Sequence, residues 1–252
     1  MDIPILVWFL VFARAGALIA VFPLFSAQPV PVQLRIALGA CIAFLTAPLL
    51  PAMATPDSFW TVMGLVFQEV SVGLLLGFVC RLVFFALDLA GGIIATEMGL
   101  MLSSNFNPLT SAALPVPGSI LFWFGIMLMF SLNLHHWIIG AFQHTYGLVP
   151  IGGAHLSEGL LLEVMRGTAE IFRLALMMAA PVMAVSFVIT LIFAVPSRAV
   201  PQMNVFTESF PVRSLAGMAV FGLTCHLMAQ HVENYLRRLP DDLVRVGHLL
   251  GG

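Results

Sequence analysis

Few residues in this chain could do chemistry, and histidine is the first to test as a metal ligand. The sequence holds 7 histidines and 3 cysteines in 252 residues. His135 and His136 are adjacent on a predicted helix, so they point about 100° apart, and no HExxH pattern completes a zinc site. His226 and His231 are five residues apart with Glu233 beyond, a poor arrangement for sharing one ion. We therefore predict no metal site.

No pattern typical of a covalent or phosphate-handling catalyst is present either. The sequence has no GxSxG motif, no Walker A glycine loop and no pair of membrane aspartates at catalytic spacing. Cys41, Cys80 and Cys225 lie in unrelated apolar segments without CxxC spacing, which indicates buried free thiols. We predict a protein that is not an enzyme, without catalytic residues and without a cofactor.

The composition is that of a membrane protein. The chain is 60% hydrophobic and 9% charged, with a mean hydropathy of +1.04, whereas soluble domains are about 25% charged. All 10 basic residues are arginine, so the chain lacks the lysine-rich tails that bind nucleic acid or anionic lipid, and we expect no nucleic-acid partner. Because Asp2 replaces a basic start and Arg14 interrupts the apolar run, residues 1–22 are interpreted as a retained first helix.

Ionisable residues inside the apolar segments must be sheltered from lipid. A charged side chain at mid-bilayer costs about 2.5–3.5 kcal/mol, so five of them would cost roughly 15 kcal/mol if all faced lipid. We expect burial, or contact with other subunits, for Arg14, Glu69, Arg81, Asp88 and Glu97. The plainer alternative for Arg81 and Asp88, seven residues apart on one helical face, is a pair that marks a helix end at the membrane interface.

Six apolar stretches separated by proline and glycine predict the helices that position these residues. Residues 119–142 carry no formal charge and would reach about 36 Å as one helix, beyond the roughly 30 Å hydrocarbon core. Residues 36–50 are too short to span and indicate half of a hairpin. We predict an all-α membrane protein of one domain, 1–252, whose helices form hairpins, some kinked or re-entrant. The stretches are 3–22, 36–50, 59–87, 119–142, 171–195 and 212–230.

An uncharged loop is predicted near residues 104–118, because glycines and prolines rule out an uninterrupted helix from 88 to 119. This loop offers Phe106, Leu109 and Leu114 and no charge. Irregular backbone with apolar side chains is tolerated at membrane depth only where it is buried in protein or lines a cavity. A hydrophobic constriction in a pore needs this combination; the alternative is an interfacial loop folded onto its own helices.

Five passages, taken together and in order, resemble the FliR/SctT family of type III secretion export-gate proteins. The order, spacing and overall length agree across nearly the whole chain. The passages are Arg14 with PLFSAQPVPVQLR at 23–35, MGLMLSSNFNP at 98–108, LNLHHWIIGAFQHTYGLVPIG at 132–152, PQMNVF at 201–206 and FPVRSLAG at 210–217. Departures at Pro117, Gly118, His136 and Glu208 leave the flagellar and injectisome branches open, with the flagellar branch preferred.

The resemblance implies an assembly with FliP-like and FliQ-like membrane subunits, and an FlhB-like subunit as a further neighbour. These would form a helically assembled cone in the bacterial inner membrane, contacting membrane lipid and lying largely on the periplasmic side of the membrane plane, within the flagellar basal body. Unfolded proteins would be exported through its channel. The family's central apolar loop acts as a plug of the closed pore, and it matches Phe106, Asn107, Pro108, Leu109 and Leu114 by position.

The polar stretch between the last two apolar segments is expected to be a turn that contacts a partner, with a solvated loop as the alternative. Its residues are Pro201, Gln202, Asn204, Phe206, Glu208, Pro211 and Arg213. A different class of protein, a small-molecule transporter or channel, would instead use the membrane charges and broken helices as a substrate site. FSAQPVPV at Phe25 and FTESFPV at Phe206 hint at the internal repeat that such a protein often shows.

Overall fold

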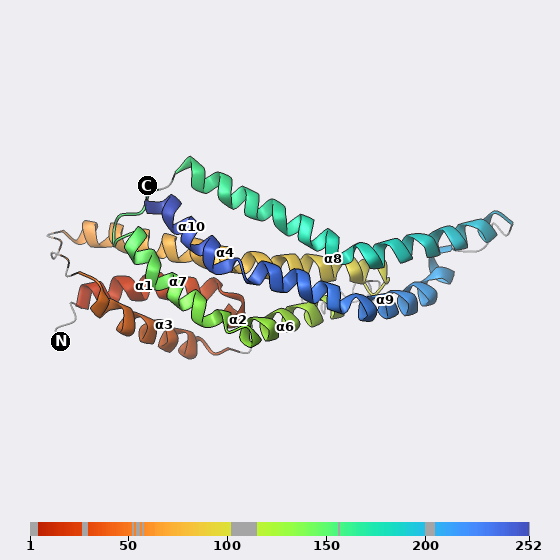
Figure 1. The fold of residues 1–252 in the computed structure, drawn as a ribbon, viewed down its shortest axis with the longest axis horizontal. Coiled ribbons are helices and arrows are strands. Elements are labelled where there is room, and N and C mark those ends of the chain that lie inside the picture. The colour runs from red at the N-terminus through yellow and green to blue at the C-terminus, as the bar shows by residue number, and fades with distance from the viewer. Residues whose placement is uncertain are drawn as a thin grey trace. The chain divides into compact units, whose positions relative to one another are not determined.

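The computed structural model describes residues 5–26, 30–51, 53, 56, 58–101, 115–155, 157–199 and 205–251. Every regular element among these residues is a helix. By its contacts the chain divides into two compact units, each assembled from separate stretches of sequence. The two longest helices, α4 (Phe59–Glu97) and α8 (Glu158–Ala199), each contribute one part to the first unit and another to the second. Figure 1 traces the helices along the chain.

The first unit comprises Met1–Leu82, Leu132–Thr168 and Arg237–Gly252. In it, α1 packs against α3 and α7 packs against α10 (Figure 1). The last helix is amphipathic: its leucines and valine at spacings of three and four are buried, because that period places them on one face. Besides parts of α4 and α8, the unit contains α1 (Ile5–Val21), α2 (Pro23–Ser26), α3 (Val32–Thr46), η1 (Ala47–Leu49), α7 (Leu134–Leu148) and α10 (Leu239–Gly251).

The second unit comprises Val83–Ser131 and Ala169–Leu236, and contains α6 (Val116–Ser131) and α9 (Val205–Leu236) beside the remaining parts of α4 and α8. Glycine allows α4 and α6 to meet backbone to backbone, since a Cβ placed on Gly91 would lie 2.1 Å from the Cα of Gly118. On the same two helices, the rings of Phe84 and Phe122 meet edge to face at 5.5 Å between centroids.

The protein is an all-α membrane protein. Among the described residues, four helical segments are long and apolar enough to cross a membrane, and α6 with α7 makes a fifth if this interrupted pair counts as one span. With 39 residues, α4 reaches about 58 Å, nearly twice the hydrocarbon core. The four segments are Val32–Leu49, Phe59–Glu97, Glu158–Pro196 and Glu208–Gly251.

The apolar stretch 119–142 is not one helix, so the expectation of a single uninterrupted span was wrong at this point. α6 ends at Ser131 and α7 begins at Leu134. Between them Asn133 adopts the left-handed conformation, with φ of 53°. Asparagine enters this conformation more readily than most residues, because its short polar side chain can bond locally.

The polar stretch before the last apolar segment is also more helical than predicted. α8 continues to Ala199 and α9 begins at Val205, so the predicted turn residues Glu208, Pro211 and Arg213 lie inside a helix. Proline inside a helix removes one backbone hydrogen bond, but the surrounding helix can continue through it. Only residues 200–204 remain for a turn, and they lie outside the described residues.

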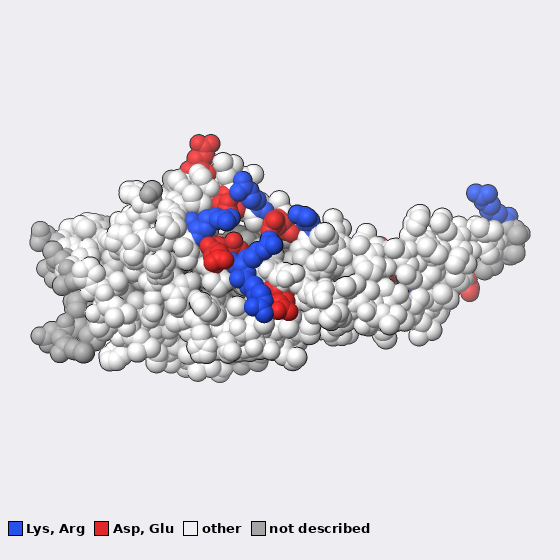
Figure 2. Space-filling view, viewed as in Figure 1, with Lys and Arg blue, Asp and Glu red and all other residues white. Residues whose placement is uncertain are grey.

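Most of the visible surface is uncharged, and most of the acidic and basic side chains that show on it gather in one area (Figure 2). Within the first unit, Glu163 forms ion pairs with Arg166 at 3.2 Å and with Arg245 at 3.1 Å. The Glu163–Arg245 pair joins the start of α8 to α10, whereas the Glu163–Arg166 pair lies within α8. Both arginine side chains are more than half exposed, so solvent screens these pairs and they add little stability.

Candidate functional site

A buried, bidentate ion pair between Arg14 of α1 and Glu69 of α4 lies in the interior of the first unit. The Arg14 Nε donates to Glu69 Oε2 at 2.6 Å, and Nη2 donates to Oε1 at 3.0 Å. The side chains are 0% and 1% exposed. Parallel bonds from a planar guanidinium to both oxygens of a carboxylate are stronger and more directional than a single contact.

The end of α7 supplies the remaining partners of this ion pair. Arg14 Nη1 and Nη2 both donate to the carbonyl oxygen of Val149 at 3.2 Å, and the Gly152 N–H donates to Glu69 Oε1 at 3.3 Å. The guanidinium carbon lies 4.0 Å from the ring centroid of Tyr146, a cation–π contact. The charges are therefore solvated by protein groups in place of water, which is the condition for burying an ion pair.

Small residues explain why α1 and α4 come close enough to pair their charges. Glu69, Gly73 and Gly77 are four residues apart and share one face of α4. A Cβ on Gly73 would lie 2.2 Å from the carbonyl oxygen of Arg14, and a Cβ on Gly77 would lie 2.9 Å from that of Leu18. Glycines at this spacing let two membrane helices approach backbone to backbone.

A tight turn after α7 aims its backbone groups at the ion pair. The Gly153 N–H donates to the carbonyl oxygen of Pro150 at 2.9 Å, and Gly152 has φ of 77°, a conformation that favours glycine. A Cβ on Gly152 would also lie 2.5 Å from Leu65 Cδ2. The positive φ therefore favours glycine at this position, and the turn presents the Gly152 N–H to Glu69.

The Arg14–Glu69 ion pair is better suited to stabilising the fold than to catalysing a reaction. Arg14 and Glu69 are both fully buried and pair with each other, so neither is placed to exchange a proton with solvent. Within the described residues no group of three metal-binding side chains comes together. The rings of His135 and His136 lie 4.1 Å apart between centroids, and the His226 Nε2 lies 3.1 Å from the amide nitrogen of Gln230.

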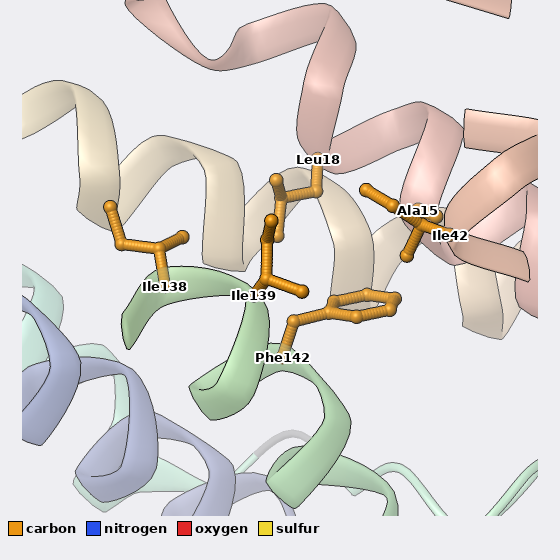
Figure 3. A pocket seen from close by; sticks show the side chains of 6 residues that line it. All are labelled: Ala15, Leu18, Ile42, Ile138, Ile139 and Phe142. Carbon is orange, nitrogen blue, oxygen red and sulfur yellow. The ribbon is translucent and has the colours of Figure 1, made fainter. Parts of the chain in front are cut away.

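A small apolar cavity lies between helices of the first unit (Figure 3). Its volume is about 20 Å³, little more than one water molecule requires. Helices α1, α3 and α7 line it, and all of its side chains are apolar, so it is too small and too unselective for a transported solute. The lining residues are Ala15, Leu18, Ile42, Ile138, Ile139 and Phe142.

The other charges predicted to be sheltered all lie on α4. Arg81, Asp88 and Glu97 are half-buried. The backbone oxygen of Glu97 accepts a hydrogen bond from the hydroxyl of Ser186 on α8 at 3.3 Å. These three residues follow one another along the helix, and the structure does not bring them to Arg14 and Glu69.

Most of the predicted plug and turn residues lie outside the described residues. In α9, Glu208 and Pro211 are exposed and Arg213 is half-buried, whereas the side chain of Phe206 is not among those described. Arg213 Nη2 donates to Thr190 Oγ1 of α8. Outside the described residues are Phe106, Asn107, Pro108, Leu109, Leu114, Pro201, Gln202 and Asn204.

The sequence predicted that Arg14 and Glu69 are sheltered from lipid, but not that they pair with each other. It also did not predict the neighbouring groups that contact them. The signal for the α1–α4 contact was available in GLLLG at 73–77, a GxxxG pattern. Tyr146 and Val149 gave no such signal, because a backbone carbonyl and an aromatic face carry no motif. Gly152 was part of the Pro-Ile-Gly passage, although its role toward Glu69 was not foreseen.

Comparison with known proteins connects the chain to bacterial export. Residues 5–239 match the family described as bacterial export proteins, family 1. The flagellar biosynthetic protein FliR of Escherichia coli K12 is 29% identical over 234 residues, covering 92% of this chain and 90% of FliR. FliR of Bacillus subtilis is 29% identical, covering 81% and 80%. The Yop proteins translocation protein T of Yersinia pestis is 27% identical, covering 95% and 94%. The chain belongs to family 1 of the bacterial export proteins, the FliR/SctT family.

Proposed function

We propose that this chain is a subunit of the type III export gate, of the flagellar type. In this proposal it forms, with FliP-like and FliQ-like membrane subunits and beside an FlhB-like subunit, a channel in the bacterial inner membrane for unfolded proteins. An apolar loop between α4 and α6, which contains Phe106, Leu109 and Leu114, helps to plug the closed pore. The chain is an export component and not an enzyme.

One observation carries this proposal: the family match runs from residue 5 to residue 239, through both compact units. An export protein of Escherichia coli aligns over nearly the same length. The likeness is therefore to a whole subunit and not to a shared membrane helix. FliR relatives from several bacteria favour the flagellar branch.

The uneven burial of the membrane helices supports a role inside an assembly. The best apolar window of α4 is 61% buried by the chain itself, whereas those of α8 and of α9 with α10 are only 28% and 17% buried. α8 leaves Phe187 and Ile192 mostly exposed, and α9 does the same with Leu215 and Leu223. Outward-facing apolar helices of this kind suit contacts with lipid and with other membrane subunits.

The plug proposal is supported by the chemistry of the loop's sequence. Phe106, Leu109 and Leu114 bring apolar bulk without charge, and a hydrophobic constriction blocks ions by excluding water. Such a barrier can still yield to a passing polypeptide, since no strong polar bond must break. The sequence therefore offers one surface that can both seal and open.

The injectisome branch is the second candidate. The Yop proteins translocation protein T aligns with 95% of this chain, and its name refers to protein translocation. A gene deletion in the source bacterium separates the two branches. Loss of swimming that the wild-type gene restores supports the flagellar gate, whereas normal swimming with loss of effector secretion supports the injectisome gate.

Gentle detergent extraction tests the proposal as a whole. A tagged copy of the full chain, expressed at its native level, should purify with two different small membrane proteins that mass spectrometry identifies as FliP-like and FliQ-like. Arg198→Ala is a suitable control for the extraction and purification steps, since Arg198 is exposed near the end of α8. Recovery of the chain alone, or only as a homo-oligomer, would favour the transporter class and contradict the proposal.

A further inference from the structure

The C-terminal end of α4 is a helix stop whose geometry requires glycine. The Leu100 N–H donates to the Ala95 carbonyl at 2.9 Å, and the Gly99 N–H donates to the Thr96 carbonyl at 3.0 Å. Gly99 has φ of 75°. These two bonds and the left-handed glycine make a Schellman motif, in which the helix ends and the chain leaves in a defined direction.

Two residues of α9 pack directly on this helix stop, within the second unit. The ring of Phe210 occupies the space that a side chain at Gly99 would need, because a Cβ there would lie 2.6 Å from the ring. About two turns further along, Gly217 makes room for Met98, which is 1% exposed; a Cβ on Gly217 would lie 2.7 Å from Met98 Cγ. We call Met98, Gly99, Phe210 and Gly217 the α4–α9 joint.

Helix α8 holds the same joint from another side. Ser186, 4% exposed, donates its hydroxyl hydrogen to the Glu97 carbonyl at 3.3 Å. One turn later, Thr190 accepts a hydrogen bond from Arg213, which lies between Phe210 and Gly217 on α9. Three helices are therefore fixed to one another where α4 ends.

We propose that Phe210 and Gly217 are positioning residues that set the direction in which the chain leaves the end of α4 toward Met101. The joint thereby fixes the point from which the loop after Met101 begins. This proposal rests on the proposed function, in which that loop plugs the pore and the start of α9 contacts a partner.

A cysteine pair tests the joint itself in the assembled complex. A Cβ on Gly217 would lie 3.7 Å from the Cβ of Met98, close to the mean of about 3.8 Å in disulfides. Met98→Cys with Gly217→Cys should therefore crosslink on mild oxidation. Met98→Cys with Gly222→Cys is the matched control, since Gly222 has no atom within 4 Å of its Cβ position. Equal crosslinking of the two pairs, or none in the first, would overturn the joint.

A measurement of ion conductance tests the function of the α4–α9 joint. Met98→Ala should raise the ion conductance of the closed complex several-fold at normal complex yield, because α4 loses its hold on α9. Met228→Ala removes an equally buried methionine 11 residues beyond Gly217 on α9 and should leave the seal intact. The loop variant Phe106→Ser with Leu109→Ser serves as the reference for a leaking pore.

The loop variant distinguishes a failure of the positioning role from a failure of the plug proposal. If the loop variant leaks and Met98→Ala does not, or Met228→Ala leaks as much, the positioning role is wrong while the plug stands. If the loop variant stays sealed, the plug is wrong and the positioning role fails with it. Leaks in the loop variant and in Met98→Ala, with a sealed Met228→Ala, support both.

Discussion

Arg14 and Glu69, 55 residues apart in the sequence, face each other through two parallel hydrogen bonds of 2.6 and 3.0 Å in the interior of the first unit. The same pair also holds the carbonyl of Val149 and the N–H of Gly152. Three helices and one turn thus depend on one pair of charges. This explains how a chain that is only 9% charged can keep an arginine and a glutamate within its apolar segments.

Glu69→Gln should destabilise the first unit and lower the yield of the assembled complex. Glutamine has nearly the same size but no charge, so Arg14 would stay buried without its counter-ion. Breaking a buried pair by removing one partner costs about 3–5 kcal/mol. Complex yield after mild extraction and the unfolding temperature in detergent measure the effect.

Glu163→Gln is the matched control for that substitution. Glu163 also pairs with arginine, but those arginine side chains are 73% and 59% exposed, so its replacement should change the stability of the protein little. Equal stability of Glu69→Gln and Glu163→Gln would show that the buried pair does not support the fold.

Gly73→Ala should separate α1 from α4. The added methyl group would lie 2.2 Å from the backbone oxygen of Arg14, and backbone cannot move aside as a flexible side chain can. We expect the free energy of unfolding to fall by about 1–3 kcal/mol or more, as it does in overpacked protein cores. Gly64→Ala, on the same helix with no atom within 4 Å of its Cβ position, should be neutral. Thermal unfolding of the two purified complexes decides between them.

The helices were predictable from sequence because long uncharged runs leave few alternatives to a membrane helix. Their ends were harder to predict. The third apolar stretch was predicted to end at residue 87, before Gly91 and Gly92, yet α4 continues to Glu97. The structure uses Gly91 for close packing against Gly118, and this packing compensates for the low helix propensity of glycine.

The ion pair shows what one sequence can and cannot predict about a site. Desolvation cost alone predicted that Arg14 and Glu69 are sheltered, because the argument needs only residue type and hydropathy. It could not choose between a neighbouring subunit and the same chain. That choice depends on how α1 docks on α4, which Gly73 and Gly77 determine through backbone contacts.

Gly91→Ala and Gly92→Ala offer a test of the second unit with two adjacent glycines. At Gly91 the new Cβ would lie 2.1 Å from the Cα of Gly118, whereas at Gly92 no atom lies within 4 Å. Gly91→Ala should therefore separate α4 from α6 and abolish or strongly reduce assembly. Gly92→Ala should assemble normally, or slightly better, since alanine favours helix by about 1 kcal/mol over glycine. Comparable complex yields for both variants would contradict the backbone contact.

Phe106→Ser with Leu109→Ser should open a leak in resting cells. If these side chains seal the pore by excluding water, two hydroxyl groups in their place would let the constriction fill with water and conduct ions. Uptake of a small dye and the membrane conductance of reconstituted complexes measure the leak. Phe187→Ser with Leu191→Ser changes the same residue types on α8, where the side chains are 63% and 52% exposed. The plug assignment requires that the loop variant leaks, that the α8 variant does not, and that both assemble; unchanged conductance in an assembled loop variant would remove it.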